Sequence, residues 1–359
     1  MLRSMGKTEH VFDPGALAAA PERAGVDERE VEASLRPARF SEFVGQTQTV
    51  DNLRVAIHAT KAREGTLDHL LLSGPPGLGK TSLGRAVAEE LGCQMISATG
   101  PGLERPRDLV GILTQLRAGD VFFIDEIHRV PAAVEEYLYT AMEDYQVDFT
   151  LDQGPHARVL PLKIEPFTLV GATTRDGLLS SPFRSRFGLF GRLDPYPTTD
   201  LVQILVRSAS LLELGLDSSA AELLASRARG TPRIVNRLLR RARDLAQVNG
   251  EGHVTKEIAW DTLTRLGIDE HGLEDMDRRL LGVLSRNAGQ PVGLKTLAAA
   301  IDESEDTIEE VFEPHLLRND FIQKTARGRL ITGAGFEAIG EEPPLGTPTP
   351  PGLFDSKGS

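Results

Sequence analysis

The chain has 359 residues, 40% of them hydrophobic, which predicts two or three globular domains of ordinary size. No apolar run approaches the roughly 18 to 20 residues of a membrane span, the N-terminus lacks the apolar stretch of a secretory signal, and the single cysteine excludes an internal disulfide. These features predict a cytoplasmic protein without a membrane partner, and the formal net charge of −12 restricts any DNA contact to a local basic patch.

Residues 1–33 show no sustained periodicity and are expected to form a flexible arm. From 34 to 196, short apolar runs alternate with helical patterns, which is typical of a parallel sheet with helices on its faces. The runs expected to be buried strands are Leu70–Leu72, Val121–Ile124 and Phe167–Val170. We therefore predict an α/β domain of the P-loop NTPase class over residues 34–196.

The first of these strands leads into Gly74-Pro-Pro-Gly-Leu-Gly-Lys80-Thr81, the pattern G-x-x-x-x-G-K-T between a strand and a helix. Glycines there let backbone N–H groups close around phosphates, and the helix N-terminus adds a favourable dipole. Lys80 is expected to reach the β and γ phosphates of ATP, and the Thr81 hydroxyl to ligate Mg²⁺. The residues of this loop expected to contact the nucleotide are Gly77, Gly79, Lys80, Thr81 and Ser82.

Carboxylates and hydroxyls follow two further strands. Asp125 and Glu126 end the strand at 121–124, where Asp125 can hold Mg²⁺ and Glu126 can polarise the attacking water as general base. Thr174, with Thr173 as the alternative, ends the strand at 167–170 and is expected to sense the γ-phosphate.

Two arginines come just after that strand, in Ser181-Pro-Phe-Arg184-Ser-Arg186. An arginine in this position can reach the nucleotide of a neighbouring subunit and neutralise charge on the transferred phosphoryl group. We favour Arg186 for this role and regard Arg184 as structural, although two solvated arginines remain the simpler alternative on spacing alone.

Two prolines near residue 196 mark a linker, and residues 197–268 follow a helical pattern throughout, which predicts a small all-α lid domain. Arg233 lies in the first turn of a helix that begins at Thr231-Pro232. Because a cation opposes the helix dipole there, a bound phosphate is the expected partner of Arg233.

Residues 269–340 read as three helices followed by a hairpin, which predicts a winged-helix domain that binds DNA. The third helix is acidic and would repel phosphate, so sequence-specific reading of the major groove is not expected. The hairpin instead gathers the three cations Lys324, Arg327 and Arg329, which are predicted to hold DNA phosphates; a solvated hairpin tip is the alternative. The Pro- and Gly-rich stretch 341–359 is expected to be a disordered tail.

With these residues in place, the chain resembles the RuvB family of bacterial Holliday-junction motors, from about Leu35 to Ile339. The stretches that carry the resemblance are Asp-His-Leu-Leu at Asp68, the phosphate loop at Gly74, Phe-Ile-Asp-Glu-Ile-His-Arg at Phe123, Ala-Met-Glu-Asp-Tyr at Ala141, Gly-Ala-Thr-Thr-Arg at Gly171 and Arg-Gly-Thr-Pro-Arg-Ile at Arg229. Their ordered series is far more specific than the phosphate loop alone.

The resemblance implies roles that spacing does not give. It makes Arg186 the arginine finger, Arg233 the second sensor and Tyr196 a nucleotide contact between the two ATPase lobes. The further nucleotide contacts that it implies are Leu35, Arg36, Glu143, Asp144 and Tyr145.

The resemblance also implies a β-hairpin at about 147–167 that docks on a RuvA-type junction-binding protein. Leu160 and Leu162 are the candidate contacts, although alternating apolar residues are more often one face of an ordinary strand, and Pro161 leaves the projecting side in doubt.

Three function classes remain open at this point. The leading one is an ATP-driven motor that migrates four-way DNA junctions as a ring of identical subunits, expected to be a hexamer, on duplex and junction DNA of any sequence; a junction resolvase is a further candidate partner. The second is a nucleotide-gated protein that loads or marks a DNA site without moving, and ATP turnover with and without junction DNA separates the two. The third is a protein unfoldase, for which the sequence offers no clear aromatic pore loop.

Overall fold

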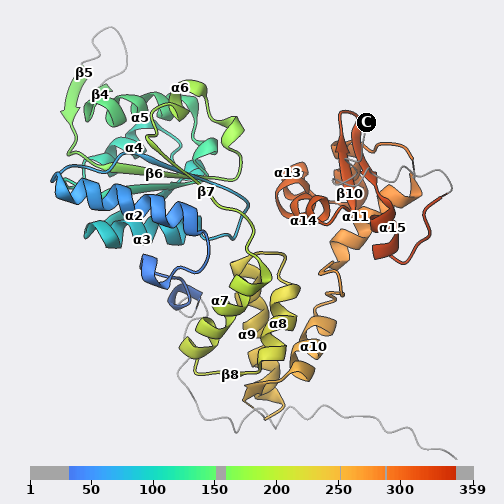
Figure 1. The fold of residues 1–359 in the computed structure, drawn as a ribbon. Coiled ribbons are helices and arrows are strands. Elements are labelled where there is room, and N and C mark those ends of the chain that lie inside the picture. Colours follow the sequence, from blue (N-terminus) through green and yellow to red (C-terminus); the bar gives the residue numbers. More distant parts are fainter. Residues whose placement is uncertain (1–31, 151–158, 251, 288, 345–359) are drawn as a thin grey trace, which may run out of the picture. The chain divides into compact units, whose positions relative to one another are not determined.

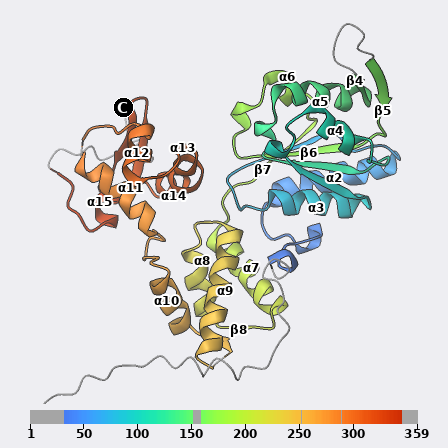
Figure 2. The same ribbon diagram turned by 180° about the vertical axis from the view of Figure 1, so that it is seen from behind.

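The computed structural model describes residues 32–150, 159–250, 252–287 and 289–344 (Figures 1 and 2). The chain divides into two compact units, Met1–Arg36 and Pro37–Ser359. Within the described ranges, no helix is both long and apolar enough to cross a bilayer. Apart from Glu32, Leu35 and Arg36, all the residues below belong to the second unit.

A five-stranded parallel sheet forms the centre of the first domain, in the order β2-β3-β6-β1-β7. Its strands are β1 (Leu70–Ser73), β2 (Met95–Thr99), β3 (Val121–Asp125), β6 (Thr168–Thr173) and β7 (Leu189–Arg192). The three strands expected from the sequence are thus β1, β3 and β6, which lie side by side in the middle. Their apolar runs are continuous because both faces of a parallel sheet are covered.

Helices cover both faces of this sheet. α2 (Thr47–Ala62) and α3 (Lys80–Leu91) lie on one face, and α4 (Pro106–Leu113) and α5 (Ala132–Asp144) on the other (Figures 1 and 2). Successive strand residues point to opposite faces, so Leu70 and Leu72 pack in one core and Leu71 in the other. The remaining short elements are η2 (Phe40–Glu42), η3 (Gly100–Gly102), η4 (Ile127–Arg129), η5 (Asp176–Leu178) and α6 (Ser181–Arg184).

A two-stranded hairpin follows α5. β4 (Gln146–Thr150) and β5 (Val159–Lys163) pair antiparallel, with Leu160 opposite Phe149 and Leu162 opposite Val147. Pro161 does not end the pairing, since Asp148 lies opposite it in register.

Four helices form the predicted lid: α7 (Thr198–Leu211), α8 (Ser218–Ser226), α9 (Pro232–Val248) and α10 (Lys256–Arg265). The structure adds a pair of two-residue parallel strands, β8 (Gly215–Leu216) and β9 (His253–Val254), which a helical pattern does not reveal. Thr231 precedes α9 with Pro232 at its first position, as the sequence predicts.

The C-terminal domain has the winged-helix elements. Its helices are α11 (Asp275–Arg286), α12 (Leu294–Ile301), α13 (Glu305–Thr307), the π-helical segment η6 (Ile308–Phe312), α14 (Glu313–Arg318) and α15 (Gly333–Ala338). The wing is β10 (Ile322–Thr325) and β11 (Gly328–Ile331). Gly328 has φ 144°, and a Cβ there would lie 2.3 Å from the Val292 carbonyl oxygen, so only glycine fits at this turn of the wing.

Candidate nucleotide site

The phosphate loop joins the end of β1 to the start of α3, in the middle of the sheet. Ligands of open α/β sheets bind at the carboxyl ends of the strands, and the ends of β1, β3 and β6 are neighbours here. Gly74, Gly77 and Gly79 all have positive φ, at 144°, 80° and 102°. Backbone of this kind can form a concave nest of N–H groups, and the loop leads directly into the N-terminus of α3, which suits an anion.

Lys80 is buried at the start of α3, and its ammonium donates to the carbonyls of Gly74 at 2.6 Å and Pro75 at 2.9 Å. These bonds hold the ammonium over the loop. Burial lowers the pKa of Lys80 to about 8, although the nearby carboxylates of Asp125, Glu310 and Glu126 act in the opposite direction. A phosphate beside this ammonium would favour its charged form.

Thr81 and Asp125 meet across the gap between α3 and β3, with the Thr81 hydroxyl donating to Asp125 Oδ2 at 3.3 Å. One hydroxyl and one carboxylate at this position fit a Mg²⁺ ion that takes its other ligands from phosphates and water. The described residues contain no cluster of three or more His, Cys, Asp or Glu side chains able to cage a metal ion alone. Ser82, the next residue, is buried in the first turn of α3.

Glu126 follows Asp125 with φ 51°, a left-handed conformation that is uncommon for residues other than glycine. Its carboxylate is partly exposed and pairs with Arg129 at 2.8 Å. The group predicted to act as general base is therefore accessible to water.

The structure separates the two threonines left open as γ-phosphate sensors. Thr173 is buried, with its hydroxyl 3.0 Å from His128 Nδ1 and 2.9 Å from the backbone N–H of Arg175. The Thr174 hydroxyl is buried and has no hydrogen-bond partner among the described residues. It also lines a cavity of about 390 Å³ together with Pro75 and Pro76 of the phosphate loop. An unpartnered hydroxyl in this position favours Thr174 as the sensor.

The lid domain also contacts the phosphate loop. A Cβ on Gly77 would lie 2.8 Å from Thr231 Cγ2 and 3.1 Å from Arg233 Cβ, so the first turn of α9 touches the loop. The buried Tyr196 hydroxyl donates to the Leu78 carbonyl at 3.2 Å, and burial raises the pKa of Tyr196 to about 12. The structure thus brings Tyr196 and Arg233 to the phosphate loop. The nucleotide contacts that the resemblance implies for them stay predictions.

Arg186 belongs to a different group of side chains. Its Nε lies 3.2 Å from Glu143 Oε1, its guanidinium carbon lies 4.5 Å from the centre of the Tyr139 ring, and it donates to the Pro182 carbonyl at 2.6 Å. The contacts that fix Arg186 therefore come from α5 and α6. Arg184 pairs with Asp176 at 3.5 Å, which supports its assignment as structural.

The other residues implied as nucleotide contacts lie at the end of α5 and in the first unit. Tyr145 packs its ring edge-on against Phe167, with centroids 6.1 Å apart, while Asp144 is exposed beside it. Leu35 is buried, and Arg36 pairs with Glu32 at 3.0 Å.

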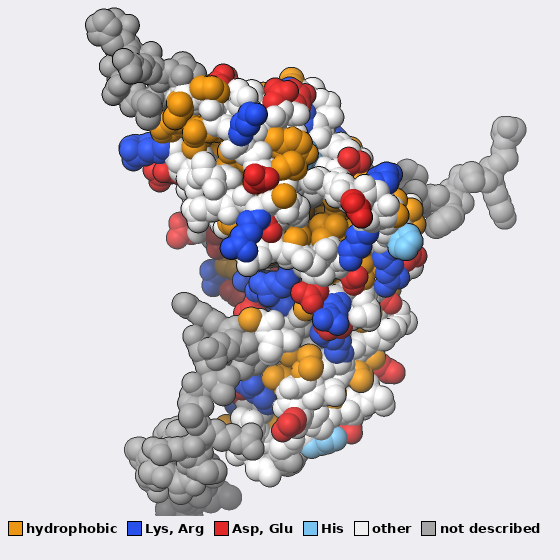
Figure 3. All heavy atoms as spheres, turned by 90° about the vertical axis from the view of Figure 1, so that its left-hand side faces the viewer, with side chains coloured by type: hydrophobic (Ala, Val, Ile, Leu, Met, Phe, Trp, Pro, Cys, Tyr) orange, Lys and Arg blue, Asp and Glu red, His pale blue; other side chains and the backbone are white. Residues whose placement is uncertain are grey.

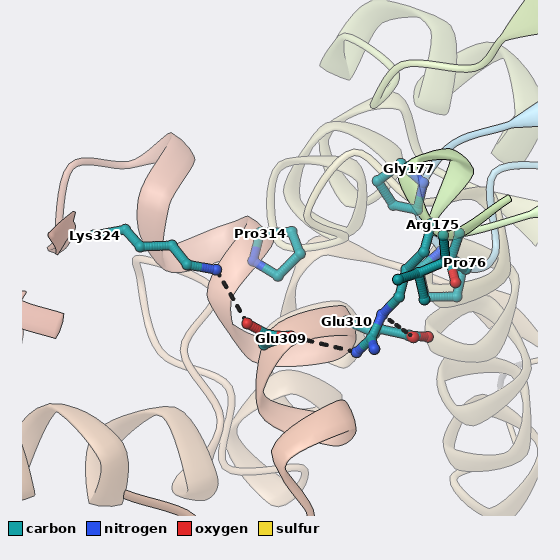
Figure 4. Close-up of a pocket in the computed structure, with 10 residues that line it drawn as sticks. Pro76, Arg175, Gly177, Glu309, Glu310, Pro314 and Lys324 are labelled. Atoms are coloured by element: carbon teal, nitrogen blue, oxygen red, sulfur yellow. Dashed lines mark hydrogen bonds and ion pairs between the residues drawn. The ribbon is translucent and has the colours of Figure 1, made fainter. Parts of the chain in front are cut away.

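Sequence reasoning missed the carboxylates that line the cavity. Figure 4 shows Arg175 reaching toward Glu309 and Glu310 of η6; its guanidinium lies 2.8 Å from Glu310 and 3.5 Å from Glu309. Asp306 also pairs with Arg175, at 2.9 Å. The sequence showed that this segment is acidic and would repel DNA. It did not show that Arg175, 134 residues before Glu309, pairs with it.

The three predicted DNA contacts in the wing fall into two kinds. Arg329 is 6% exposed, and its guanidinium donates to Glu313 and, at 3.0 Å, to Glu309. Lys324 is half exposed and pairs with Glu309 at 3.1 Å, whereas Arg327 is exposed at the turn. Arg327 and, in part, Lys324 are accessible to a phosphate; the Arg329 guanidinium is already held inside the domain.

The hairpin candidates also differ. The Leu160 side chain is 44% exposed, whereas Leu162 is partly buried against the core of the first domain. Figure 3 shows hydrophobic side chains on the surface at the base of the grey segment at the top of the view.

This fold and site define a P-loop ATPase of the AAA+ class. Three family models match in chain order: the Holliday junction DNA helicase RuvB P-loop domain over residues 35–193, the RuvB AAA lid domain over 196–269, and the RuvB C-terminal winged helix domain over 270–340. The chain belongs to the RuvB family.

Individual relatives agree over nearly their whole length. The Holliday junction branch migration complex subunit RuvB of Myxococcus xanthus is 53% identical over 323 residues, covering 90% of this chain and 93% of the relative. The subunit of the same name from Chlorobium luteolum is 53% identical, over 85% and 89%. The solved Holliday junction branch migration motor RuvB of Thermotoga maritima superposes with a TM-score of 0.80 at 45% identity, covering 86% of this chain and 99% of the other.

Proposed function

We propose that this chain is an ATP-driven motor that migrates four-way DNA junctions as a ring of identical subunits, with a hexamer expected. The observation that supports a ring is that the predicted site residues fall into two separate groups. Lys80 bonds the phosphate loop, Thr81 contacts Asp125, and Thr174 lines a cavity with Pro75 and Pro76 of that loop. By contrast, α5 and α6 hold Arg186 in a separate group. A neighbouring subunit would then supply Arg186 to the nucleotide.

Hydrolysis in this proposal uses the side chains around the phosphate loop. Lys80 and the backbone of Gly77 and Gly79 bind the β and γ phosphates, and Glu126 orients and deprotonates the attacking water. Mg²⁺, held through Thr81 and Asp125, would neutralise part of the charge on the phosphates. Thr174 bonds the γ-phosphate through its free hydroxyl, and the trans Arg186 stabilises the charge that develops on the transferred group.

The contacts of the lid with the loop support a route from chemistry to movement. Arg233 and Tyr196 lie on elements of the second lobe or its linker and touch the loop at Gly77 and Leu78. Loss of the γ-phosphate would remove a partner of Arg233 and let α9 shift relative to the sheet. The further nucleotide contacts that we propose from family membership are Leu35, Arg36, Ser82, Glu143, Asp144 and Tyr145.

The DNA and protein partners follow from the outer domains and the relatives. The exposed Arg327 and the half-exposed Lys324 would hold duplex phosphates without reading sequence. Leu160, with Leu162 beneath it, would dock a RuvA-type junction-binding protein, and a junction resolvase is a further candidate. Such a motor would work on DNA in the cytoplasm.

Dissociation of a synthetic four-way junction tests this function. We expect ATP-dependent branch migration with the RuvA-type partner present, and ATP turnover that rises when junction DNA is added. Turnover that ignores both DNA and partner would instead favour a nucleotide-gated loading protein, and turnover stimulated by an unfolded polypeptide would favour an unfoldase.

Mixed rings test the trans arginine. Arg186→Ala subunits keep an intact pocket but supply no finger, and Glu126→Gln subunits supply a finger but lack the base. We expect each variant to be inactive alone and the mixture to recover part of the ATPase activity. Mixtures that stay inactive while both variants assemble into rings would contradict the trans role.

A further inference from the structure

Tyr139, on α5, lies directly beneath the guanidinium of Arg186. The guanidinium carbon is 4.5 Å from the centre of the tyrosine ring, well inside the roughly 6 Å limit of a cation–π contact. Arg186 is partly buried there, with a side chain 21% exposed, so the contact is shielded in part from water. The ring face therefore restricts where the guanidinium can lie.

The tyrosine itself is anchored at its far end. Its hydroxyl donates to the Glu135 carboxylate, one turn earlier on α5, and lies 2.9 Å from the Ser180 hydroxyl. Ser180 donates to the same Glu135 oxygen at 2.5 Å, and its side chain also caps α6 by accepting from the Phe183 N–H at 3.3 Å. One carboxylate thus ties Tyr139 to the segment that carries Arg186.

The guanidinium of Arg186 has N–H donors that its other contacts do not use. Arg186 gives one N–H to the Pro182 carbonyl, while its buried Nε, though 3.2 Å from Glu143, has no hydrogen-bond partner among the described residues. A planar guanidinium carries five donors, so a stacked arginine can still bind phosphate oxygens with its outer edge.

We infer that Tyr139 is a positioning residue for the trans-acting Arg186: its anchored ring holds the guanidinium of the finger in place for the nucleotide of the next subunit. This inference rests on the proposed function, in which Arg186 acts across the subunit interface. A preplaced arginine loses less conformational freedom when the transition state forms, and so stabilises it more. Tyr139 touches no phosphate and acts through Arg186.

Removing the ring should slow hydrolysis without weakening nucleotide binding. We expect Tyr139→Leu in the full-length chain to lower kcat by about tenfold, the effect of losing a partly shielded cation–π contact. Binding of a fluorescent ATP analogue to the variant's own pocket should stay unchanged. Tyr139→Phe keeps the ring face and should retain activity to within about threefold.

Mixed rings show which subunit's pocket loses activity. This distinguishes a residue that positions Arg186 from one that only supports the fold. Mixed with Glu126→Gln subunits, Tyr139→Leu subunits should recover activity as Arg186→Ala subunits do, because the finger then comes from an unaltered neighbour. Mixed with Glu126→Gln subunits, the double variant Arg186→Ala, Tyr139→Leu should recover as much activity as Arg186→Ala alone, since Tyr139 acts only through that arginine. A defect that stays in the variant's own pocket would not be rescued, and would overturn the inference.

Tyr137→Leu is the matched control, because Tyr137 packs on the same helix against the same core, while the cation–π contact of Arg186 found among the described residues is with Tyr139. It should keep kcat. Tyr139→Met fills the site with a flexible chain and carries the same expectations as Tyr139→Leu, so the test does not depend on one variant folding. If Arg186→Ala is rescued and neither Tyr139 variant is, this inference alone fails; if Arg186→Ala is not rescued, the proposed trans role fails first.

Discussion

The guanidinium of Arg329 donates to the carboxylate of Glu313 inside the C-terminal domain, where Arg329 is 6% and Glu313 2% exposed. The pair joins strand β11 of the wing to the start of α14. Lys324 and Arg329 also share Glu309, and although burial opposes the shift, their hydrogen bonds and charges lower the pKa of that carboxyl. The acidic third helix thus binds the base of the wing.

This pairing predicts different results for two wing arginines. Arg329→Met should lower the free energy of unfolding of the C-terminal domain by about 2 kcal/mol, because the buried Glu313 carboxylate then keeps its contact with Lys324 at 3.5 Å but loses the hydrogen bond from Arg329. Arg327→Ala should leave stability unchanged and weaken DNA binding, with the salt dependence of the affinity falling by about one unit of slope. Urea unfolding and DNA titrations at several salt concentrations measure the two effects. Equal loss of DNA affinity in both variants, with no loss of stability, would show that Arg329 binds phosphate directly.

Lys80 predicts a pH dependence of ATP binding. Because the pKa of Lys80 is lowered to about 8, its ammonium is present below pH 8 and is lost as the pH rises above it. The phosphates of ATP favour the charged form of Lys80. Above about pH 8, ATP binding should therefore be accompanied by the uptake of at most one proton, and the affinity for ATP should fall by at most about tenfold per pH unit.

Calorimetry of ATP binding at pH 7 and 8.5, in buffers of different ionisation enthalpy, measures this proton uptake. Lys80→Arg is the control, since arginine stays charged throughout this range and should show no uptake from this position. Wild-type binding without proton uptake at pH 8.5 would contradict the prediction.

Glu310 predicts an electrostatic cost to ATP binding. Its carboxylate pairs with Arg175 at 2.8 Å and acts on the pKa values of both Lys80 and His128, so it faces the phosphate pocket. Glu310→Gln removes this negative charge and should tighten ATP binding roughly fivefold at low salt, about 1 kcal/mol. The gain should shrink at high salt. Glu305→Gln, on the preceding turn, is the control, and unchanged or weaker binding in Glu310→Gln would refute the argument.

The sequence predicts well what local pattern determines. The apolar runs at β1, β3 and β6 are buried on both faces, and the loop at Gly74 follows its strand directly, so the sequence predicted where the phosphate loop and Asp125 lie. Their roles in nucleotide binding stay predictions. The Pro after Thr231 likewise marked the start of α9 correctly.

Side-chain partners far apart in the sequence could not be predicted in this way. Arg329 counted as a surface cation until the fold brought Glu313, 16 residues earlier, against it. The choice between Thr173 and Thr174 depended on which hydroxyl His128 occupies, and that requires tertiary structure. Tyr139 carried no motif of its own, and only its contact with Arg186 makes it a candidate.

His315, on α14, predicts that the C-terminal half of the molecule is sensitive to acid. Burial, followed by the charges of Arg229 and Arg318, lowers the pKa of His315 to about 4, while the His271 carbonyl and Asp269 act in the opposite direction. Its Nδ1 lies 3.1 Å from the Asn319 amide nitrogen and its Nε2 3.2 Å from the His271 carbonyl oxygen. The neutral ring satisfies both contacts, by accepting at Nδ1 and donating at Nε2, whereas a proton on Nδ1 would break the first.

The unfolded chain takes up this proton near pH 6.5 and the folded chain only near pH 4. The neutral His315 therefore makes its full contribution to the free energy of unfolding above pH 6.5. This contribution, about 3 kcal/mol, is lost as the pH falls toward 4. His315→Gln cannot be protonated and should lose less stability between pH 7.5 and 4.5 than the wild type, as measured by urea unfolding followed by circular dichroism. His58→Gln, at an exposed position on α2, is the control and should lose as much stability as the wild type. If His315→Gln also loses as much stability as the wild type, the acid sensitivity arises elsewhere, because removal of the His315 imidazole would then have had no effect.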